Sequence, residues 1–171
     1  MPLQPFKNVD GAPVPFNPPS KVGTFDVTTC FATNGEAQTL TATGYLGNGL
    51  QLDVGPGLFE GYWIIDFTAR KQSTGDESYT FYLLGSNDPN FANGNVEILD
   101  AQNFGGARSI AAIPGASPAL PVPVTGSGEV NYDPVLNMKS GIVYRYIRCY
   151  LVVAGTAPSV TVNSWLTYDA C

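Results

Sequence analysis

The stretch that decides the fold is residues 142–168, IVYRYIRCYLVVAGTAPSVTVNSWLTY. Valine, isoleucine, threonine and aromatic residues dominate it, and these residue types favour β-strands. The segment Gly155-Thr156-Ala157-Pro158 interrupts them and is typical of a turn. The stretch therefore predicts a long strand from Ile142 to Ala154, a turn, and a second strand from Ser159 to Tyr168, which together form a hairpin.

The same strand-forming composition recurs upstream at a spacing of roughly ten residues. The predicted strands are Thr24 to Phe31, Ala37 to Thr43, Leu50 to Val54, Phe59 to Ala69, Glu77 to Ser86, Asn95 to Asp100, and Glu129 to Leu136, the last closed by Asp133-Pro134. No stretch of the sequence has the spacing of an amphipathic helix. Residues 24–171 are therefore expected to form an all-β domain of two packed antiparallel sheets, a β-sandwich or jelly roll.

Residues 1–23 differ from the rest of the chain because they contain six prolines. Proline is excluded from helix interiors and central strands, so this segment predicts an extended arm. A flexible linker would lack apolar residues, whereas this segment has several spaced along it. The residues expected to bind a partner are Pro5, Phe6, Val14, Phe16 and Val22. The alternative interpretation is a disordered tail.

The overall composition excludes several classes of function. The chain has 171 residues, a net charge of −6, and only 13% charged residues. Nucleic-acid binding requires clustered Lys and Arg, and anionic membranes attract the same residues, so neither is an expected partner. The sequence also lacks a cationic region followed by an apolar run, and it lacks about 18 consecutive apolar residues. These features favour synthesis in a cytoplasm.

The sequence offers little material for catalysis or metal binding. It has no histidine, which is the usual general base and the commonest metal ligand. Aspartates such as Asp66, Asp88 and Asp133 occupy strand and turn positions, so a glycosidase-like carboxylate pair or a calcium site is not favoured. No catalytic residue, metal ligand or cofactor is therefore predicted. Cys30 and Cys149 are expected to be buried, whereas the role of Cys171 stays open.

The strand from Ile142 to Ala154 has two different faces, because side chains alternate along a strand. One face is apolar apart from Arg145 and is expected to lie in the core. The other carries Tyr144, Tyr146, Arg148 and Tyr150. Tyrosine and arginine are enriched in protein–protein interfaces, so this face is the second predicted partner-binding surface. The alternative is an ordinary solvated outer face.

Two blocks of the sequence resemble a known family. Residues 83–91, LLGSNDPNF, look like a strand and its S-x-D-P-x-F turn in the jelly-roll cement proteins of short-tailed bacteriophages, and residues 144–161, YRYIRCYLVVAGTAPSVT, are similar to that family's closing strands. The resemblance implies a jelly roll, a homotrimer, and attachment to the outside of the capsid across neighbouring major capsid protein subunits. It also implies a location in the virion and no catalytic residues.

The expected function is therefore that of a structural, non-enzymatic capsid cement protein. The proline-rich arm and the loop from Pro114 to Pro123 depart from the family pattern and leave the mode of attachment open. The alternative is a carbohydrate-binding jelly roll, either receptor-binding or lectin-like, in which exposed tryptophan and tyrosine contact the sugar. For that alternative, Trp63 is expected to lie in the core, and the position of Trp165 is open.

Overall fold

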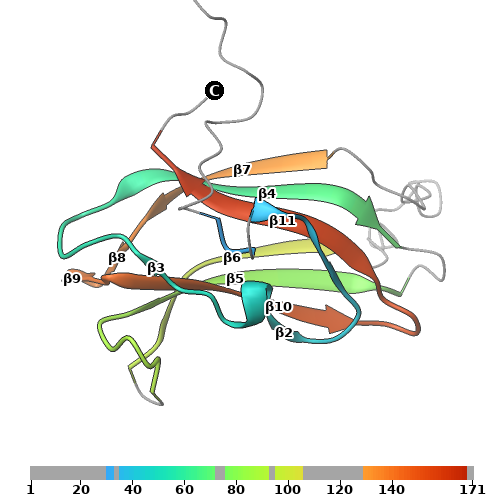
Figure 1. The fold of residues 1–171 in the computed structure, drawn as a ribbon, viewed down its shortest axis with the longest axis horizontal. Helices are drawn as coiled ribbons and strands as arrows, with labels where there is room; N and C mark the ends of the chain where they lie inside the picture. The colour runs from blue at the N-terminus through green and yellow to red at the C-terminus, as the bar shows by residue number, and fades with distance from the viewer. Residues whose placement is uncertain (1–29, 33–34, 72–75, 93–94, 106–128, 169–171) are drawn as a thin grey trace, which may run out of the picture.

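The computed structural model describes residues 30–32, 35–71, 76–92, 95–105 and 129–168. Strands dominate these residues and form two antiparallel sheets that pack face to face (Figure 1). The strands are β1 (Gln38–Leu40), β2 (Gly44–Tyr45), β3 (Leu52–Asp53), β4 (Glu60–Arg70), β5 (Ser78–Ser86), β6 (Glu97–Gly105), β7 (Glu129–Leu136), β8 (Met138–Lys139), β9 (Ile142–Val143), β10 (Tyr146–Ala154) and β11 (Val160–Thr167). The predicted β-sandwich is confirmed.

The strand order gives the sandwich its topology. The first sheet has the order β1-β11-β4-β7, and the second has the order β2-β10-β5-β6, with β3 also paired to β10. Strands that are consecutive in the chain mostly lie in different sheets, which is the arrangement of a jelly roll. The strands β8 and β9 form a small separate hairpin at one end.

The predicted hairpin between β10 and β11 is wrong. The strand β10 pairs with β5 in the second sheet, and β11 pairs with β4 in the first. Their connection crosses from one sheet to the other through Gly155, whose φ of 112° favours glycine. A Cβ at this position would lie 2.6 Å from the Cα of Glu77, so the backbones meet closely at the crossing.

Two further predictions about where strands are interrupted or end are wrong. The strand from Ile142 to Ala154 is broken at Tyr144 and Arg145, where the chain passes from the β8–β9 hairpin into β10. Pro134 does not close β7 but lies within it, opposite Tyr62. The strand β7 pairs only with β4, so proline occupies an edge strand, where a missing N–H is tolerated. Most of the predicted strand from Thr24 to Phe31 lies outside the described residues.

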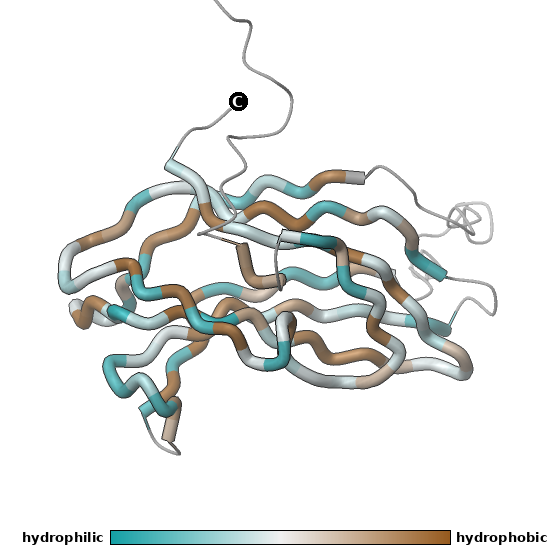
Figure 2. Tube along the Cα trace, in the orientation of Figure 1, coloured by the Kyte–Doolittle hydropathy of each residue, from teal (hydrophilic) through white to brown (hydrophobic). Residues whose placement is uncertain are grey.

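The core lies between the two sheets. Apolar and polar residues alternate along the longer strands, as Figure 2 shows. Trp63, Ile65 and Phe67 of β4 face Phe81, Leu83 and Ile147 of the second sheet, and all six are fully buried. The prediction that Trp63 belongs to the core is confirmed. Its indole Nε1 donates a 2.8 Å hydrogen bond to Ser164 Oγ, which satisfies the one polar group of the side chain.

The side chain of Asn137 connects three segments at one end of the sandwich by hydrogen bonds. This residue is fully buried between β7 and β8. Its Oδ1 accepts a hydrogen bond from the backbone N–H of Phe59 at 2.7 Å. Its Nδ2 donates to the carbonyl oxygens of Gly57 and Tyr144, both at 2.9 Å. One side chain thereby fixes the chain entering β4 relative to the break between β9 and β10, which positions the surface described next.

Candidate functional site

The predicted tyrosine and arginine surface lies on the outer side of the second sheet. Along β10 the residues alternate, with Ile147, Cys149 and Leu151 buried and Tyr146, Arg148 and Tyr150 partly exposed. Tyr45 and Tyr82 join the last three from the neighbouring strands. We call this surface the tyrosine face; it consists of Tyr45, Tyr82, Tyr146, Arg148 and Tyr150.

Three of these tyrosines form a row across the sheet. Tyr150 of β10 lies opposite Tyr45 of β2 on one side and opposite Tyr82 of β5 on the other. The rings of Tyr45 and Tyr150 pack edge to face, with centroids 4.8 Å apart and planes at 67°. Cross-strand aromatic pairs of this kind stabilise a sheet and hold their rings in one orientation. The row is therefore a preorganised surface with hydroxyl groups at its outer edge.

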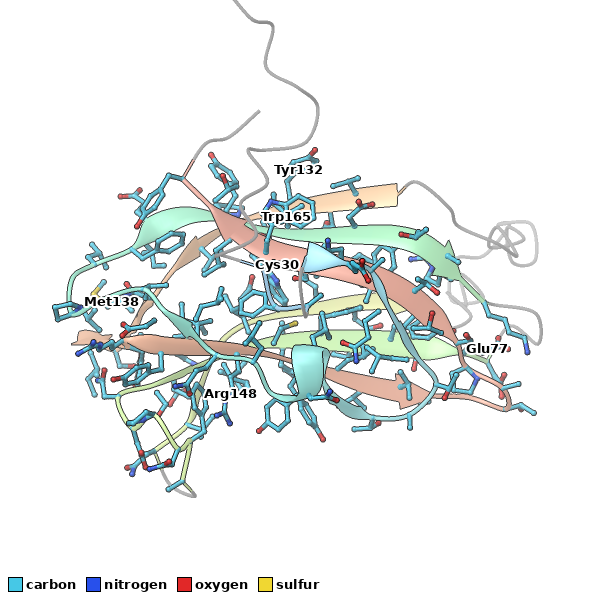
Figure 3. All side chains as sticks on the ribbon, viewed as in Figure 1. Cys30, Glu77, Tyr132, Met138, Arg148 and Trp165 are labelled. Atoms are coloured by element: carbon cyan, nitrogen blue, oxygen red, sulfur yellow. The ribbon has the colours of Figure 1, made fainter. Side chains whose placement is uncertain are left out.

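Arg148 links the tyrosine row to the loop between β5 and β6. Its guanidinium carbon lies 4.2 Å from the ring centroid of Phe91 and 5.7 Å from that of Tyr45. Its Nη2 donates a 3.2 Å hydrogen bond to Gln51 Oε1. Figure 3 shows Arg148 beside this loop, on the opposite side of the molecule from Tyr132. Stacking on an aromatic ring holds the guanidinium in place and leaves it less mobile than an exposed arginine.

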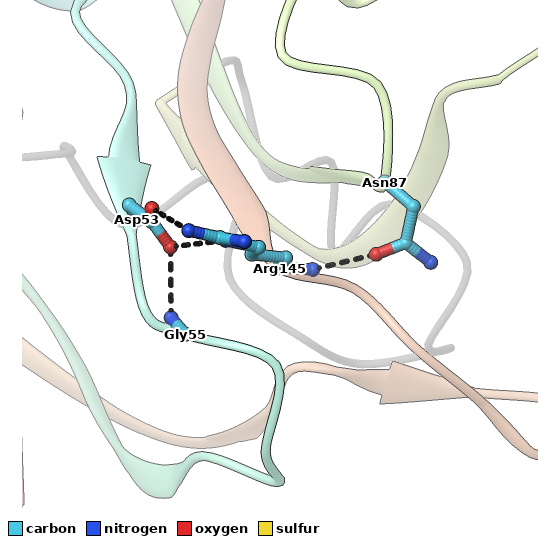
Figure 4. Close-up of polar contacts among 4 residues, drawn as sticks. All are labelled: Asp53, Gly55, Asn87 and Arg145. Carbon is cyan, nitrogen blue, oxygen red and sulfur yellow. Dashed lines mark hydrogen bonds and ion pairs between the residues drawn. The ribbon is translucent and has the colours of Figure 1, made fainter.

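A second arginine fixes the edge of the tyrosine face (Figure 4). Arg145 donates two hydrogen bonds to the carboxylate of Asp53, from Nε at 2.8 Å and from Nη2 at 2.7 Å. Its backbone N–H donates to Asn87 Oδ1 at 2.9 Å. The hydrogen bonds from Arg145 lower the pKa of Asp53 below its usual value. Arg145 also lies over the ring of Tyr146, so this pair anchors one end of the face.

The structure separates Tyr144 from the other three residues of the predicted surface. Tyr144 lies at the break before β10 and lines a different groove of about 430 Å³ with Ile142 and residues of the β5–β6 loop. The predicted arm residues, Pro5, Phe6, Val14, Phe16 and Val22, lie outside the described part of the chain. Nothing in the sequence places Tyr45 on this surface, because β2 has only two residues.

Two carboxyl groups, those of Asp100 and Asp133, lie side by side elsewhere in the sandwich. Across the described segments, no group of three or more His, Cys, Asp or Glu residues is placed to hold a metal ion. Asp133 of β7 accepts a hydrogen bond from Gln102 of β6 and lies beside Asp100. Burial and this neighbouring carboxyl raise the pKa of Asp133 to about 6. The pair lies where the edges of the two sheets meet, not in a cleft.

The buried cysteines and tryptophans also bear on function. Cys30 and Cys149 are buried, as predicted, and burial raises the pKa of both thiols. Trp63 and Trp165 have at most 2% of their surface exposed. Neither tryptophan therefore offers a free ring face to a sugar.

Comparisons with known proteins assign no family to the chain. No protein-family model matches the sequence. A search of curated proteins finds no matching relative. None of the helical residues in the described ranges belongs to a segment long and apolar enough to span a membrane. The tyrosine face is an aromatic surface that also carries arginine, and both residue types are enriched in protein–protein interfaces.

Proposed function

We propose that this protein is a non-enzymatic capsid cement protein that binds the outside of an assembled bacteriophage head. The observation that carries the proposal is the tyrosine face, a preorganised aromatic row bordered by Arg148 on a β-sandwich. The resemblance of residues 83–91 and 144–161 to phage cement proteins supplies the partner, the major capsid protein. The same resemblance supports a homotrimer on the surface of the virion.

The proposed mechanism is thermodynamic. A protein that binds the assembled shell, and not its separated subunits, shifts the equilibrium toward the assembled state. Tyrosine and arginine suit this role because they bury a large area at a small cost in side-chain entropy and keep a polar group for hydrogen bonding. Many copies on one symmetric lattice each contribute, so a modest affinity for each contact is sufficient.

The arm of residues 1–23 is proposed as the second attachment element. Its spaced apolar residues, among them Phe6 and Phe16, are suited to an apolar surface on a neighbouring subunit. An extended segment of 23 residues spans up to about 75 Å, which is enough to reach beyond one sandwich. The tyrosine face and the arm would then contact different parts of the shell.

Sugar binding is the weaker alternative, and the ring geometry argues against it. Sugars stack on exposed, flat aromatic faces. The rings of Tyr45 and Tyr150 meet at 67°, so they do not form one flat platform. Binding of a glycan by the purified protein, without affinity for any capsid lattice, would favour this alternative.

The proposal is tested with capsids of the encoding phage prepared without this protein. Purified protein should bind them to saturation and raise their melting temperature. The variant Tyr150→Ala should bind at least tenfold more weakly, since central interface tyrosines often contribute about 2 kcal/mol. The matched control is Leu58→Ala, which removes a side chain that is 55% exposed and lies outside the tyrosine face.

Three outcomes would each refute a part of the proposal. Absence of saturable binding to the capsid would exclude the cement function. Equal binding by Tyr150→Ala, Leu58→Ala and the unchanged protein would remove the tyrosine face from the interface. Deleting residues 1–20 should weaken attachment while the sandwich still folds. If the shortened chain binds equally well, the arm has no role in attachment.

A further inference from the structure

The outer side of the first sheet is unusually apolar for a surface that faces away from the core. One row of residues crosses this side of the sheet. Trp165 of β11 lies opposite Cys30, which precedes β1, and also opposite Ile64 of β4. Ile64 in turn lies opposite Tyr132 of β7. Ile64 is fully buried and Trp165 is 2% exposed, although neither belongs to the core between the sheets. These residues form a second, smaller apolar cluster on the outer side of the first sheet, and the partly buried Tyr62 and Tyr132 pack against it.

An aromatic groove continues this surface toward one end of the sandwich. It has a volume of about 440 Å³, and its lining includes Tyr62, Pro134, Leu136 and Tyr168. Tyr62 and Pro134 are directly opposite each other on β4 and β7. Tyr168 is 70% exposed, and Leu136 is 39% exposed. Grooves lined by tyrosine and proline bind proline-rich segments, because rigid proline rings pack against aromatic rings at a low cost in entropy.

The path of the chain leads toward this groove. Cys30 and Trp165 form an antiparallel bridge, and the N–H of Phe31 donates to the carbonyl oxygen of Ser164 at 2.8 Å. Because the bridge is antiparallel, the chain at Cys30, followed toward its N-terminus, points along β11 toward Leu166, Thr167 and Tyr168. From Trp165 to Tyr168 is about 10 Å along a strand. A stretch of ten residues spans at most about 35 Å, so the groove is within the reach of residues 12–19.

The composition of that segment, and the charge of residues 1–23 around it, suit the groove. Residues 12–19 are APVPFNPP, with four prolines and one phenylalanine. Residues 1–23 contain two lysines and one aspartate, a net charge of +1. Residues 24–171 contain six basic and thirteen acidic residues, a net charge of −7, and Glu60 lines the groove. Opposite net charges attract the arm to the sandwich.

We propose that the aromatic groove of Tyr62, Pro134, Leu136 and Tyr168 binds residues 12–19 of the same chain. The free protein then carries its arm against the first sheet, on the side opposite the tyrosine face. Docking holds Phe16 in the groove and covers the exposed ring of Tyr168. This inference does not depend on the capsid role, because both the groove and its occupant belong to one chain.

The direct test is nuclear magnetic resonance of the full-length protein in dilute solution. Ring protons of Tyr62 or Tyr168 should show nuclear Overhauser effects to the δ protons of prolines in residues 12–19. A mixture of isotope-labelled and unlabelled chains separates contacts within one chain from contacts between chains. Contacts within one chain are expected. Absence of these contacts, or contacts only between different chains, would overturn the proposal.

A second test measures how often the arm leaves the groove. Chymotrypsin cleaves after Phe16 only in undocked molecules, so the cleavage rate reports their fraction. The variant Tyr168→Ala should raise this rate by about three- to tenfold, the size expected for losing an aromatic contact. Replacing the four prolines of residues 12–19 by alanine should raise it similarly, and combining both changes should add little.

The matched control is Leu50→Ala, which removes a side chain that is 41% exposed and does not line the groove. Its cleavage rate after Phe16 should equal that of the unchanged protein. An unchanged rate in Tyr168→Ala would overturn the proposal. So would an equal increase in Leu50→Ala, because the effect would then not come from the groove.

Discussion

Replacing Asp133 by asparagine should stabilise the protein at neutral pH and leave it unchanged near pH 4.5. Asp133 lies beside Asp100 and accepts a hydrogen bond from Gln102, and burial together with the neighbouring carboxyl raises its pKa from 3.8 to about 6. The folded protein therefore binds this proton more tightly than the unfolded chain does. The protonated carboxyl of Asp133 therefore stabilises the folded protein fully below about pH 4, and this stabilisation is lost as the pH rises through about 6. Asparagine resembles the protonated acid at every pH.

The expected magnitude follows from the pKa difference. About two pH units correspond to about 3 kcal/mol for a fully desolvated group. The Asp133 carboxyl is only partly buried, so solvent screening reduces the effect to about 1 kcal/mol. For a protein of 171 residues this raises the melting temperature by about 2–4 °C at pH 7. The sequence has no histidine, so no unperturbed side chain titrates between pH 5 and 7.

The assay is thermal unfolding followed by circular dichroism from pH 4.5 to 7.5. The matched control is Asp88→Asn, because hydrogen bonds from the N–H groups of Asn90 and Ala92 lower the pKa of Asp88, which places its titration below this range. The unchanged protein and the control should lose stability between pH 5 and 7, and Asp133→Asn should lose less. If Asp133→Asn keeps the full slope, or if the unchanged protein gains stability over this interval, the reasoning is refuted.

Two substitutions and one labelling experiment test the packing and the polar contacts. Asn137→Ala removes one buried and two partly buried hydrogen bonds to the backbone and should lower the free energy of unfolding in urea by about 2 kcal/mol or more; a loss below about 1 kcal/mol would contradict this. Arg145→Met removes the ion pair with Asp53, in which both side chains are more than 40% exposed, and should lower the melting temperature only slightly, because exposed ion pairs contribute little to stability. A loss that persists undiminished in 1 M salt would show that screening does not govern this pair. Burial raises the pKa of the Cys149 thiol, so a thiol reagent should label Cys149 only on unfolding, as located by mass spectrometry. Labelling of the folded protein would show that β10 opens locally.

The sequence predicted the strands whose apolar residues alternate over eight or more positions. Trp63, Ile65 and Phe67 lie on one face of β4 as expected, and β5, β7 and β11 fall within a residue or two of their predicted limits. Alternation is a local property, so it is visible without knowledge of the neighbouring strands. Because alternation is local, it does not show which strands pair, and the hairpin predicted for residues 142–168 is therefore wrong. An apolar face is required whether β11 pairs with β10 or crosses to the opposite sheet.

The tyrosine face could be predicted only in part for the same reason. Tyr146, Arg148 and Tyr150 follow from alternation along β10. Tyr45 joins them because β2 pairs with β10 more than one hundred residues later in the chain. Phe91 reaches Arg148 through the loop after β5 and has a φ of 53°, which nothing in the local sequence indicates. Contacts set by pairing between distant segments require the fold, and both the position of Tyr45 and the stacking of Arg148 on Phe91 depend on such contacts.

The two outer faces of the sandwich suit different occupants. The outer row on the first sheet is apolar and already buried at Ile64 and Trp165, and its groove lies on the path of the chain that ends at Cys30. The tyrosine face carries hydroxyl groups and a stacked guanidinium, so it stays compatible with water until a partner covers it. An apolar groove filled by the same chain avoids aggregation in the free protein. A polar aromatic face can stay exposed, and for this reason we place the attachment to a shell on the second sheet.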